Sequence, residues 1–293
     1  MNELSKINDH LCVTDNWSFP VDTFDLHTVT NFESIDVPPS MARCIVRTDT
    51  NQVLGVHGSK YKAIKHDDVV NSVFDAVDGA NISHDYTSSI EVFDNGAKMR
   101  GVITFNDLVV EPVKDDYIKF QIKFFNSYDS SWAFQQLAQG LRLWCLNGCT
   151  TADTVATTWA KHTTNVSVKG SAAKIHAGLQ SFLNTPEMYR EWMNVPVSYD
   201  QAEAFFKATL CKVQTNTSEQ KFNMIQLGTL MTYWSTEAKS LGTNKWALYN
   251  ACTYWATHTD GNKSPANTQR LRENALSKAF KTSAWQTALN GSW

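Results

Sequence analysis

The feature that most constrains this chain is an alternation of apolar and polar residues in the stretch YIKFQIKF, residues 117–124. Successive side chains of a β-strand point to opposite faces of its sheet, so an alternation with a period of two indicates a half-buried strand. The stretch therefore predicts a strand whose apolar face, with Phe120 and Ile122, lies in the core. Lys119 and Lys123 are expected to be exposed on its basic outer face.

The next segment predicts a turn and then a helix. Residues 126–131, NSYDSS, have the small polar side chains that form turns and cap helix N-termini. Apolar residues then recur near helical spacing from Trp132 to Trp144, and Asn147-Gly148 is a pair suited to the left-handed backbone at a helix end. We expect a helix over 131–146 that packs against the strand and forms the core of the fold with it.

The chain before this stretch predicts further strands and one helix. The pair Asp67-Asp68 opens the helix, since acidic residues favour a helix N-terminus, and Gly79 is expected to stop it. Short turns between the strands favour antiparallel neighbours. The fold class is therefore α+β, an antiparallel β-sheet with packed helices in the order β-β-α-β-β-β-α. Its strands are expected at residues 43–47, 53–56, 88–93, 97–105 and 117–124, with a hairpin turn, DNG, at 94–96.

Two further regions flank this core. The first 40 residues read as an arm that ends in the stiff segment Pro38-Pro39-Ser40. Packing of this arm on a neighbouring subunit and packing on the chain's own body both remain open. The pattern beyond residue 150 is helical, with helices expected at 174–183, 187–193, 200–212, 218–240, 246–256 and 268–289. This organisation predicts an N-terminal arm at 1–40, an α+β core domain at 41–184 and a helical C-terminal region at 185–293.

Composition and charge indicate the cellular compartment and the kinds of binding partner to expect. The net charge is −3, so bulk charge does not favour a polyanionic partner, and a nucleic-acid surface would have to be a local patch. The six cysteines form no C-x-x-C pair, and we expect them to be reduced and mostly buried, as in a cytosolic protein. Residues 1–16 lack the apolar core of a signal peptide, and no apolar run approaches the roughly 18 residues of a membrane span. The chain is therefore expected to be soluble and cytoplasmic, with no membrane partner.

Several common catalytic and cofactor motifs do not occur in the sequence. It contains no G-x-x-x-x-G-K, G-x-G-x-x-G, G-x-S-x-G or H-E-x-x-H pattern. These absences count against the commonest nucleotide, hydrolase and metalloprotease chemistries, and we expect no cofactor and no metal. Whether the protein is an enzyme stays open, although the leading hypothesis is non-enzymatic. An enzymatic alternative would use a site near His57, Asp129 and His162.

Basic residues on two predicted strands give the sharpest functional signal. Lys98 and Arg100 share one face of the first strand, and Lys119 and Lys123 share one face of the second. If the strands are neighbours, four cations line one sheet face beside Tyr117, which supplies a stacking ring. A groove for single-stranded nucleic acid needs this combination of cations and rings, whereas an ordinary solvated face would carry the same charges. The patch would be extended by Arg142 and Lys161.

Four segments resemble, in order, the phage/plasmid-like family of unknown function, which is found on bacteriophages, plasmids and integrated elements. They are GVHGSKYKAI at 55–64, FNSYDSS at 125–131, LRLWCLNG at 141–148 and KHT at 161–163. The resemblance implies a mobile-element protein in the cytoplasm of an infected bacterial host. It implies no particular activity.

A second resemblance is architectural. The order of a helix, a β-hairpin, a third strand and a long helix is similar to the core of the Rad-type single-strand annealing proteins, which phage Red-beta and Erf annealing proteins are thought to share. In this chain the corresponding elements would be the helix at 67–77, the strands at 88–93, 97–105 and 117–124, and the helix at 131–146. The resemblance implies a basic groove in a ring or filament.

These patterns together favour a phage-encoded, non-enzymatic protein that binds single-stranded DNA and promotes annealing during recombination or replication. It would act as a homo-oligomer, either a ring or a filament. Two alternatives stay open: an enzyme that acts on nucleic acid or nucleotides, and an interaction protein such as an inhibitor of host defence or a structural component. In the leading hypothesis the contacts to DNA come from Lys98, Arg100, Tyr117, Lys119, Lys123, Arg142 and Lys161.

Overall fold

The computed structural model describes residues 11–13, 16–30, 33–39, 41–142, 147–149, 157–160, 162, 172–213, 220–258 and 264–290. The chain forms two compact units that interleave along the sequence. The first unit comprises residues 1–108, 121–138 and 156–179, and the second comprises 109–120, 139–155 and 180–293. Antiparallel sheets with packed helices, followed by a mainly helical C-terminal part, confirm the predicted α+β fold class.

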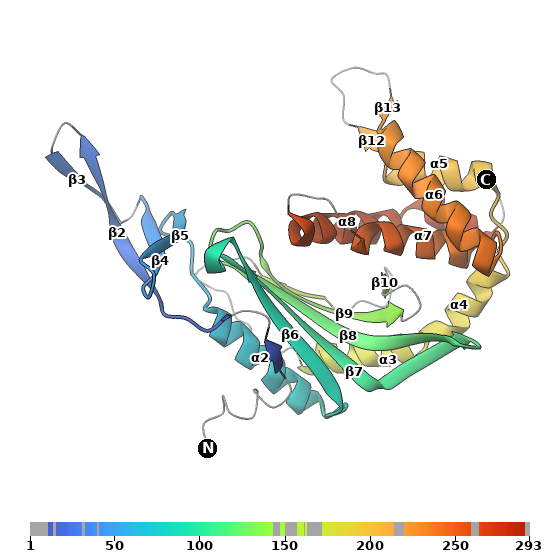
Figure 1. The fold of residues 1–293 in the computed structure, drawn as a ribbon, viewed down its shortest axis with the longest axis horizontal. Helices are drawn as coiled ribbons and strands as arrows, with labels where there is room; N and C mark the ends of the chain where they lie inside the picture. The colour runs from blue at the N-terminus through green and yellow to red at the C-terminus, as the bar shows by residue number, and fades with distance from the viewer. Residues whose placement is uncertain are drawn as a thin grey trace. The chain divides into compact units, whose positions relative to one another are not determined.

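The largest sheet in the described part of the chain has seven strands (Figure 1). Their order is β1-β6-β7-β8-β9-β10, and β11 also pairs with β9. Strands β6 and β7 pair antiparallel around the turn Asp94–Gly96, as predicted, whereas β1 runs parallel to β6. The strands are β1 (Leu11–Val13), β6 (Tyr86–Phe93), β7 (Lys98–Val113), β8 (Asp116–Ser127), β9 (Phe134–Arg142), β10 (Asn147–Cys149) and β11 (Thr157–Ala160).

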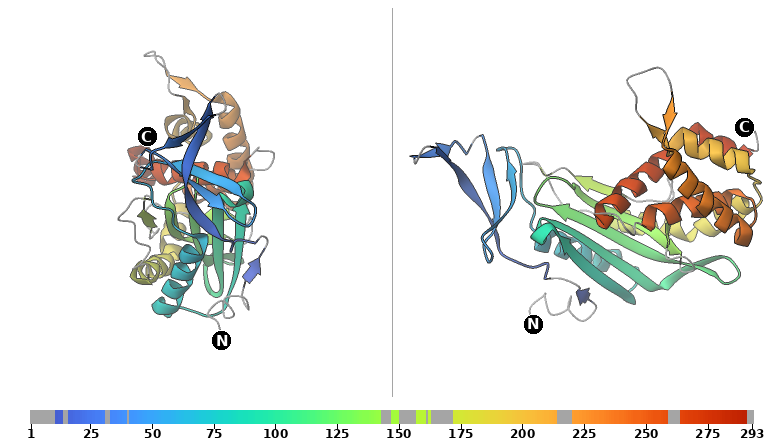
Figure 2. Two further views of the ribbon diagram at one scale, coloured as in Figure 1. Left: turned by 90° about the vertical axis from the view of Figure 1, so that its left-hand side faces the viewer. Right: turned by 45° about the horizontal axis from the view of Figure 1, so that its top comes forward.

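Helices α2 (His66–Ala80) and α3 (Ala172–Leu183) lie on one face of this sheet (Figures 1 and 2). Helix α2 ends in Asn81, whose φ of 48° is left-handed, rather than at the predicted Gly79. Its ring contact to the sheet joins Phe74 to Tyr86, with centroids 6.1 Å apart. Four valines of this helix are buried, namely Val69, Val70, Val73 and Val77.

The alternation that defined β8 is confirmed on its apolar side. Phe120 and Ile122 are completely buried. The ring of Phe120 lies 5.3 Å from that of Phe182 on α3. On the opposite face the prediction is wrong for Lys123, which is buried, and Lys119 is half-buried. The second face of β8 is therefore covered by protein at Gln121 and Lys123, whereas Tyr117 at its start is exposed.

The predicted helix over 131–146 is wrong. Strand β9 forms there instead, and β10 contains Asn147 and Gly148. Residues 136–140 are buried on both faces of β9, and a segment buried on both faces does not show the alternation that distinguishes a strand from a helix. The pairing partners of β9, namely β10 and β11, come from later segments of the chain. The core thus lacks, at this position, the long helix of the annealing-protein comparison.

A second sheet of four strands has the order β3-β2-β4-β5. Strands β4 and β5 lie where they were predicted. Residues of the predicted arm form β2 and β3, and β2 pairs with β4, so this part of the arm packs on the chain's own sheet. The strands are β2 (Val21–Thr30), β3 (Glu33–Val37), β4 (Arg43–Arg47) and β5 (Gln52–His57). A small apolar core beneath this sheet consists of Phe19, Ile45, Leu54, Ala97 and Tyr128.

The C-terminal part is mainly helical, as predicted. Ser198 caps α5 through a reciprocal pair of hydrogen bonds with Gln201. The long predicted helix begins at Met224 rather than at residue 218, and the last predicted helix is two helices, α8 and α9. The elements are α4 (Thr185–Met193), α5 (Tyr199–Thr209), β12 (Lys212–Val213), β13 (Lys221–Phe222), α6 (Met224–Leu241), α7 (Lys245–Thr257), α8 (Pro265–Ala279) and α9 (Ser283–Asn290).

None of the helices in the described part of the chain is both long enough and apolar enough to cross a bilayer.

Candidate functional site

Three aromatic rings stack where β5 ends. The ring centroids of His57 and Tyr61 lie 3.8 Å apart, with 15° between the ring planes. The ring of His162 lies 5.2 Å from that of Tyr61, at an angle of 18°. Tyr61 therefore stacks nearly parallel to two imidazoles, and we call these three residues the ring stack.

Main-chain groups hold the ring stack in place. The Nε2 atom of His57 lies 2.5 Å from the carbonyl oxygen of Tyr128, and the Tyr61 hydroxyl donates to the carbonyl oxygen of Ser127 over 3.0 Å. The backbone N–H of Lys62 donates to the carbonyl oxygen of His162 over 3.3 Å. Burial and the negative charge of Asp129 raise the pKa of Tyr61 well above its usual value, so its hydroxyl stays protonated as a donor.

His162 is the buried end of the ring stack. Its side chain is 6% exposed, and among the described residues neither ring nitrogen has a hydrogen-bond partner. Burial lowers the pKa of His162, because an imidazolium ion is costly to bury, and the imidazole is therefore neutral at pH 7. A neutral, stacked imidazole provides an aromatic surface rather than a positive charge.

His66 lies near the ring stack and has a structural role. Its Nε2 atom lies 3.0 Å from the carbonyl oxygen of Gly96, and its Nδ1 atom lies 2.9 Å from the amide nitrogen of Asn126. The carbonyl accepts and the amide donates, so both nitrogens of a neutral imidazole are satisfied. Burial lowers the pKa of His66 to about 4, in agreement with a neutral, fully bonded side chain.

The carboxylate of Asp129 is held by its neighbours. It accepts hydrogen bonds from the backbone N–H of Ser131 at 2.9 Å and from the Ser131 hydroxyl at 2.6 Å. The ammonium group of Lys98 lies 3.4 Å away. Burial works to raise the pKa of Asp129, but the bonds from Ser131 and the charge of Lys98 outweigh it and keep the pKa below its usual value. Asp129 is therefore ionised and fixes the turn after β8.

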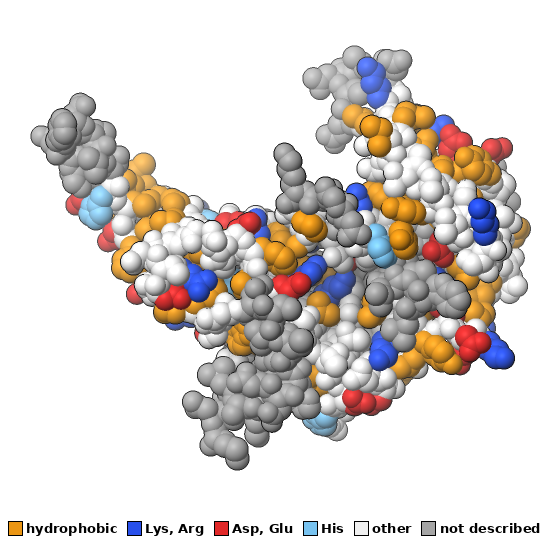
Figure 3. Space-filling view, viewed as in Figure 1, with side chains coloured by type: hydrophobic (Ala, Val, Ile, Leu, Met, Phe, Trp, Pro, Cys, Tyr) orange, Lys and Arg blue, Asp and Glu red, His pale blue; other side chains and the backbone are white. Residues whose placement is uncertain are grey.

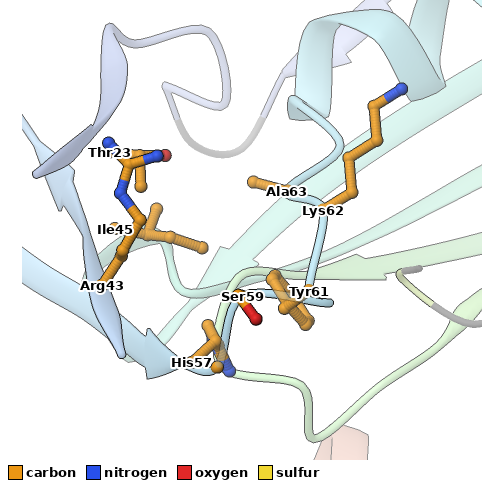
Figure 4. A pocket seen from close by; sticks show the side chains of 9 residues that line it. Thr23, Arg43, Ile45, His57, Ser59, Tyr61, Lys62 and Ala63 are labelled. Carbon is orange, nitrogen blue, oxygen red and sulfur yellow. The ribbon is translucent and has the colours of Figure 1, made fainter. Parts of the chain in front are cut away.

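Two pockets adjoin the ring stack. The first, which we call the sheet-side pocket, has a volume of about 250 Å³. Figure 4 shows Arg43 on the sheet side of this pocket and Tyr61 on the loop side, with the Lys62 side chain extending away from Arg43. The guanidinium of Arg43 pairs with Asp25 over 3.2 Å, and both side chains are about half exposed. The lining residues are Thr23, Arg43, Ile45, His57, Gly58, Ser59, Tyr61, Lys62 and Ala63.

The second pocket, which we call the turn-side pocket, has a volume of about 380 Å³. It is lined by His57, Gly58, Ser59, Lys60, Tyr61 and Ser130. Lys60 and Lys62 are both exposed, so each pocket has an exposed lysine among its lining residues. Within the described residues, no group of three or more His, Cys, Asp or Glu side chains is placed to hold a metal ion.

A family model for a domain of unknown function, DUF932, matches residues 53–278. The chain belongs to the DUF932 family. No curated protein and no solved structure matches it. The DUF932 match covers the ring stack and both lysines of the pockets, whereas Arg43 precedes it. Membership of a family of unknown function agrees with the coarser part of the predicted resemblance.

Two of the predicted DNA-contacting residues lie on β7 of the DUF932 domain, and both are ion-paired. Lys98 lies 2.5 Å from Asp94 and also near Asp129, and Arg100 pairs with Glu91. These carboxylates already neutralise both cations, so β7 does not present the open basic face that the sequence predicted.

The predicted DNA-contacting residues on β8 lie on the same face of the sheet as Lys98 and Arg100 of β7. Gln121 donates to the hydroxyl of Thr104 over 2.9 Å, which places the polar sides of the two strands together. Lys119 and Lys123 point away from the face of Phe120 on this strand. However, Lys123 is only 6% exposed. Tyr117 is 42% exposed, as a stacking ring requires. Lys161 lies outside the described residues.

Arg142 is buried and belongs to a separate polar cluster in the second unit. Its Nε atom donates to Asp116 over 2.7 Å, its Nη1 donates to the side-chain oxygen of Asn250 over 3.1 Å, and Glu237 lies 3.5 Å away. The guanidinium also lies 5.5 Å from the ring centroid of Trp246. Arg142 is therefore a structural cation, and it does not extend an exposed patch.

The cations of the two pockets were not among the residues predicted from the sequence. Lys60 and Lys62 lie in the GVHGSKYKAI segment, which was singled out only for its resemblance to a family, whereas Arg43 lies on the preceding strand β4. The clustering of glycine, histidine, lysine and tyrosine in that segment was the available signal. Sequence reasoning did place His57, Asp129 and His162 together, and the structure brings the segments that carry them side by side.

Proposed function

We propose that this protein binds single-stranded DNA at the ring stack and its two pockets. It would be a phage-encoded, non-enzymatic protein that promotes annealing in the cytoplasm of an infected bacterium. The observation that supports this proposal is the position of Arg43, Lys60 and Lys62 beside the stacked rings of His57 and Tyr61. Cations that neutralise phosphates beside aromatic surfaces are typical of sites for single strands, which are bound with little base preference.

The homo-oligomer of this proposal would form through the outer face of the four-stranded sheet. Phe24, Cys44 and Val56 are cross-strand partners in β2, β4 and β5, and Val53 pairs with Val46. Phe24, Val53 and Val56 are each about half exposed, which is unusual for large apolar side chains on neighbouring strands. Figure 3 shows hydrophobic side chains gathered along these strands.

An enzymatic function at the same place is the second candidate, because His57, Asp129 and His162 come from segments that meet there. General acid-base catalysis needs side chains that are available for proton transfer within hydrogen-bond reach of a substrate. His57 uses Nε2 for the Tyr128 carbonyl, and Asp129 is engaged by Ser131 and Lys98. Because these side chains already take part in hydrogen bonds or ion pairs, a binding function is favoured over a catalytic one.

The proposal is tested by fluorescence anisotropy with a labelled single-stranded oligonucleotide at low and high salt. Binding should weaken steeply with salt, because phosphate contacts release counterions. The double variant Lys60→Glu/Lys62→Glu should lose binding. The matched control Lys174→Glu/Lys281→Glu reverses two exposed lysines elsewhere and should bind as the wild type does. No binding by the wild type at micromolar concentration and low salt would refute the proposal, and turnover of the oligonucleotide would favour the enzyme.

Self-association is tested separately by light scattering and by electron microscopy with and without single-stranded DNA. Val53→Lys/Val56→Lys should reduce the particle mass, since it places charges on the apolar face. A monomeric wild type at all concentrations, with and without DNA, would contradict the oligomer part of the proposal.

A further inference from the structure

We infer that the site takes a strand that spans at least two consecutive nucleotides, with one phosphate at each pocket. This inference rests on the proposed function and specifies its ligand. The sheet-side and turn-side pockets share the wall formed by His57, Gly58, Ser59 and Tyr61. Two pockets with one common wall are adjacent subsites, and a ligand that fills both must pass the edge of the ring stack.

The backbone turn at residues 58–61 places one lysine at each of the two subsites. The N–H of Tyr61 donates to the carbonyl oxygen of Gly58 over 3.0 Å and closes this turn. Because of the turn, Lys60 lines the turn-side pocket and Lys62 lines the sheet-side pocket, with Tyr61 between them. Arg43 is the second cation of the sheet-side pocket. Two separated positive groups match two phosphates of one strand better than they match a single phosphate.

The sizes of the two pockets favour single nucleotide units of a strand over a large cofactor as the ligand. Pockets for complete small molecules typically enclose about 300–1,000 Å³. The volume of about 250 Å³ lies below that range, and the volume of about 380 Å³ lies near its lower end. Each pocket therefore suits one nucleotide unit, and neither alone suits a dinucleotide cofactor.

The charges already present allow a phosphate to enter. Arg43 is paired with Asp25, but both side chains are about half exposed, so water competes for the ion pair and a phosphate can take the place of the carboxylate at little cost. Lys60 and Lys62 are exposed and on flexible stems, so both can turn toward a backbone that crosses the stack. The contacts involve phosphates and ring surfaces, and sequence preference should be small.

The test compares the affinities of thymidine monophosphate, a dinucleotide with a 5′-phosphate, and longer oligothymidylates for the full-length protein. We expect the dinucleotide to bind at least tenfold more tightly than the mononucleotide. Lys60→Gln should weaken dinucleotide binding severalfold and mononucleotide binding less, because a mononucleotide can still occupy the pocket that contains Arg43. Arg43→Gln should weaken both. Lys65→Gln is the control, since Lys65 is a nearby exposed lysine that lines neither pocket.

The slope of binding against salt provides a second readout. Loss of one phosphate contact should reduce the log–log slope for a single strand by roughly 0.7 in Lys60→Gln and again in Arg43→Gln. Equal affinities for the mononucleotide and the dinucleotide would overturn the two-subsite inference while leaving the proposed function intact. Tight binding of long strands that is insensitive to Arg43, Lys60 and Lys62 would also overturn it. Failure of every oligonucleotide to bind would refute the proposed function itself.

Discussion

The Nε2 atom of His57 lies 2.5 Å from the carbonyl oxygen of Tyr128. A carbonyl oxygen only accepts, so Nε2 donates and Nδ1 is the ring nitrogen left to accept a hydrogen bond. The contact depends on Gly55, where β5 passes close to the turn after β8. A Cβ atom at Gly55 would collide with the Tyr128 carbonyl oxygen and would lie 2.5 Å from His57 Nε2 and 3.1 Å from the Cα of Asp129.

Gly55→Ala should therefore destabilise the protein and disturb the ring stack. We expect a loss of about 1–3 kcal/mol in the free energy of unfolding, the usual cost of overpacking. Urea denaturation measures this loss. The control is Gly58→Ala, whose Cβ would lie 3.5 Å from the Met41 carbonyl oxygen, an ordinary contact. Equal stabilities of the two variants would contradict the close approach at Gly55.

The pKa of His66 predicts a pH-dependent stability. The folded-state pKa of about 4 is below the ordinary value of 6.5, so the unfolded chain binds a proton more readily between these values. Stability should thus fall as the pH drops from 6.5 to 4, by about 3 kcal/mol for this group. His66→Gln keeps a donor and an acceptor but cannot titrate. Its stability deficit relative to the wild type should shrink over this pH range, and a constant deficit from pH 7 to pH 4 would rule the assignment out.

Phe120→Ala should cost about 3–5 kcal/mol of stability, because it leaves a cavity where the ring meets Phe182. Tyr117→Ala, three positions earlier on the same strand, removes a 42% exposed ring and should cost far less. Chemical denaturation of both variants checks the register of β8. Similar losses for the two would mean that this register is incorrect.

Arg142→Met should destabilise by about 3–5 kcal/mol, since it leaves the buried carboxylates of Asp116 and Glu237 without their cation. Arg100→Met is the matched control. The partner of Arg100, Glu91, is 33% exposed and remains in contact with water, so the loss should be at most about 1 kcal/mol. Thermal or urea unfolding distinguishes the two, and a near-neutral Arg142→Met would show that the cluster contributes little.

Much of the fold could be predicted from local pattern. The alternation at 117–124, the DNG turn and the acidic start of the helix at Asp67 each correspond to the observed element. Each of these signals is carried by neighbouring residues, since strand and helix periods repeat within a few positions. The cap of α5 at Ser198 is equally local, since its partner Gln201 lies three residues further along the chain.

The candidate site could be predicted only in part. His57, Asp129 and His162 were predicted to share a site, but Lys98 and Arg100 on β7 proved to be ion-paired and Lys123 on β8 is buried. Whether a lysine faces water depends on which acidic residue or strand lies opposite, and those partners are distant in the sequence. Arg43 and Lys62 come together at one pocket for a similar reason, because the turn at 58–61 brings the loop toward the sheet.

Periodicity and turn chemistry were sufficient to specify an α+β chain with a strand at 117–124 and helices toward its end. Tertiary structure alone decided that residues 134–142 form a strand, because a segment buried on both faces takes its conformation from its partners rather than from its own pattern. It alone also decided that the three rings stack, since Tyr61 and His162 are separated by a hundred residues of chain and meet only through the folded backbone.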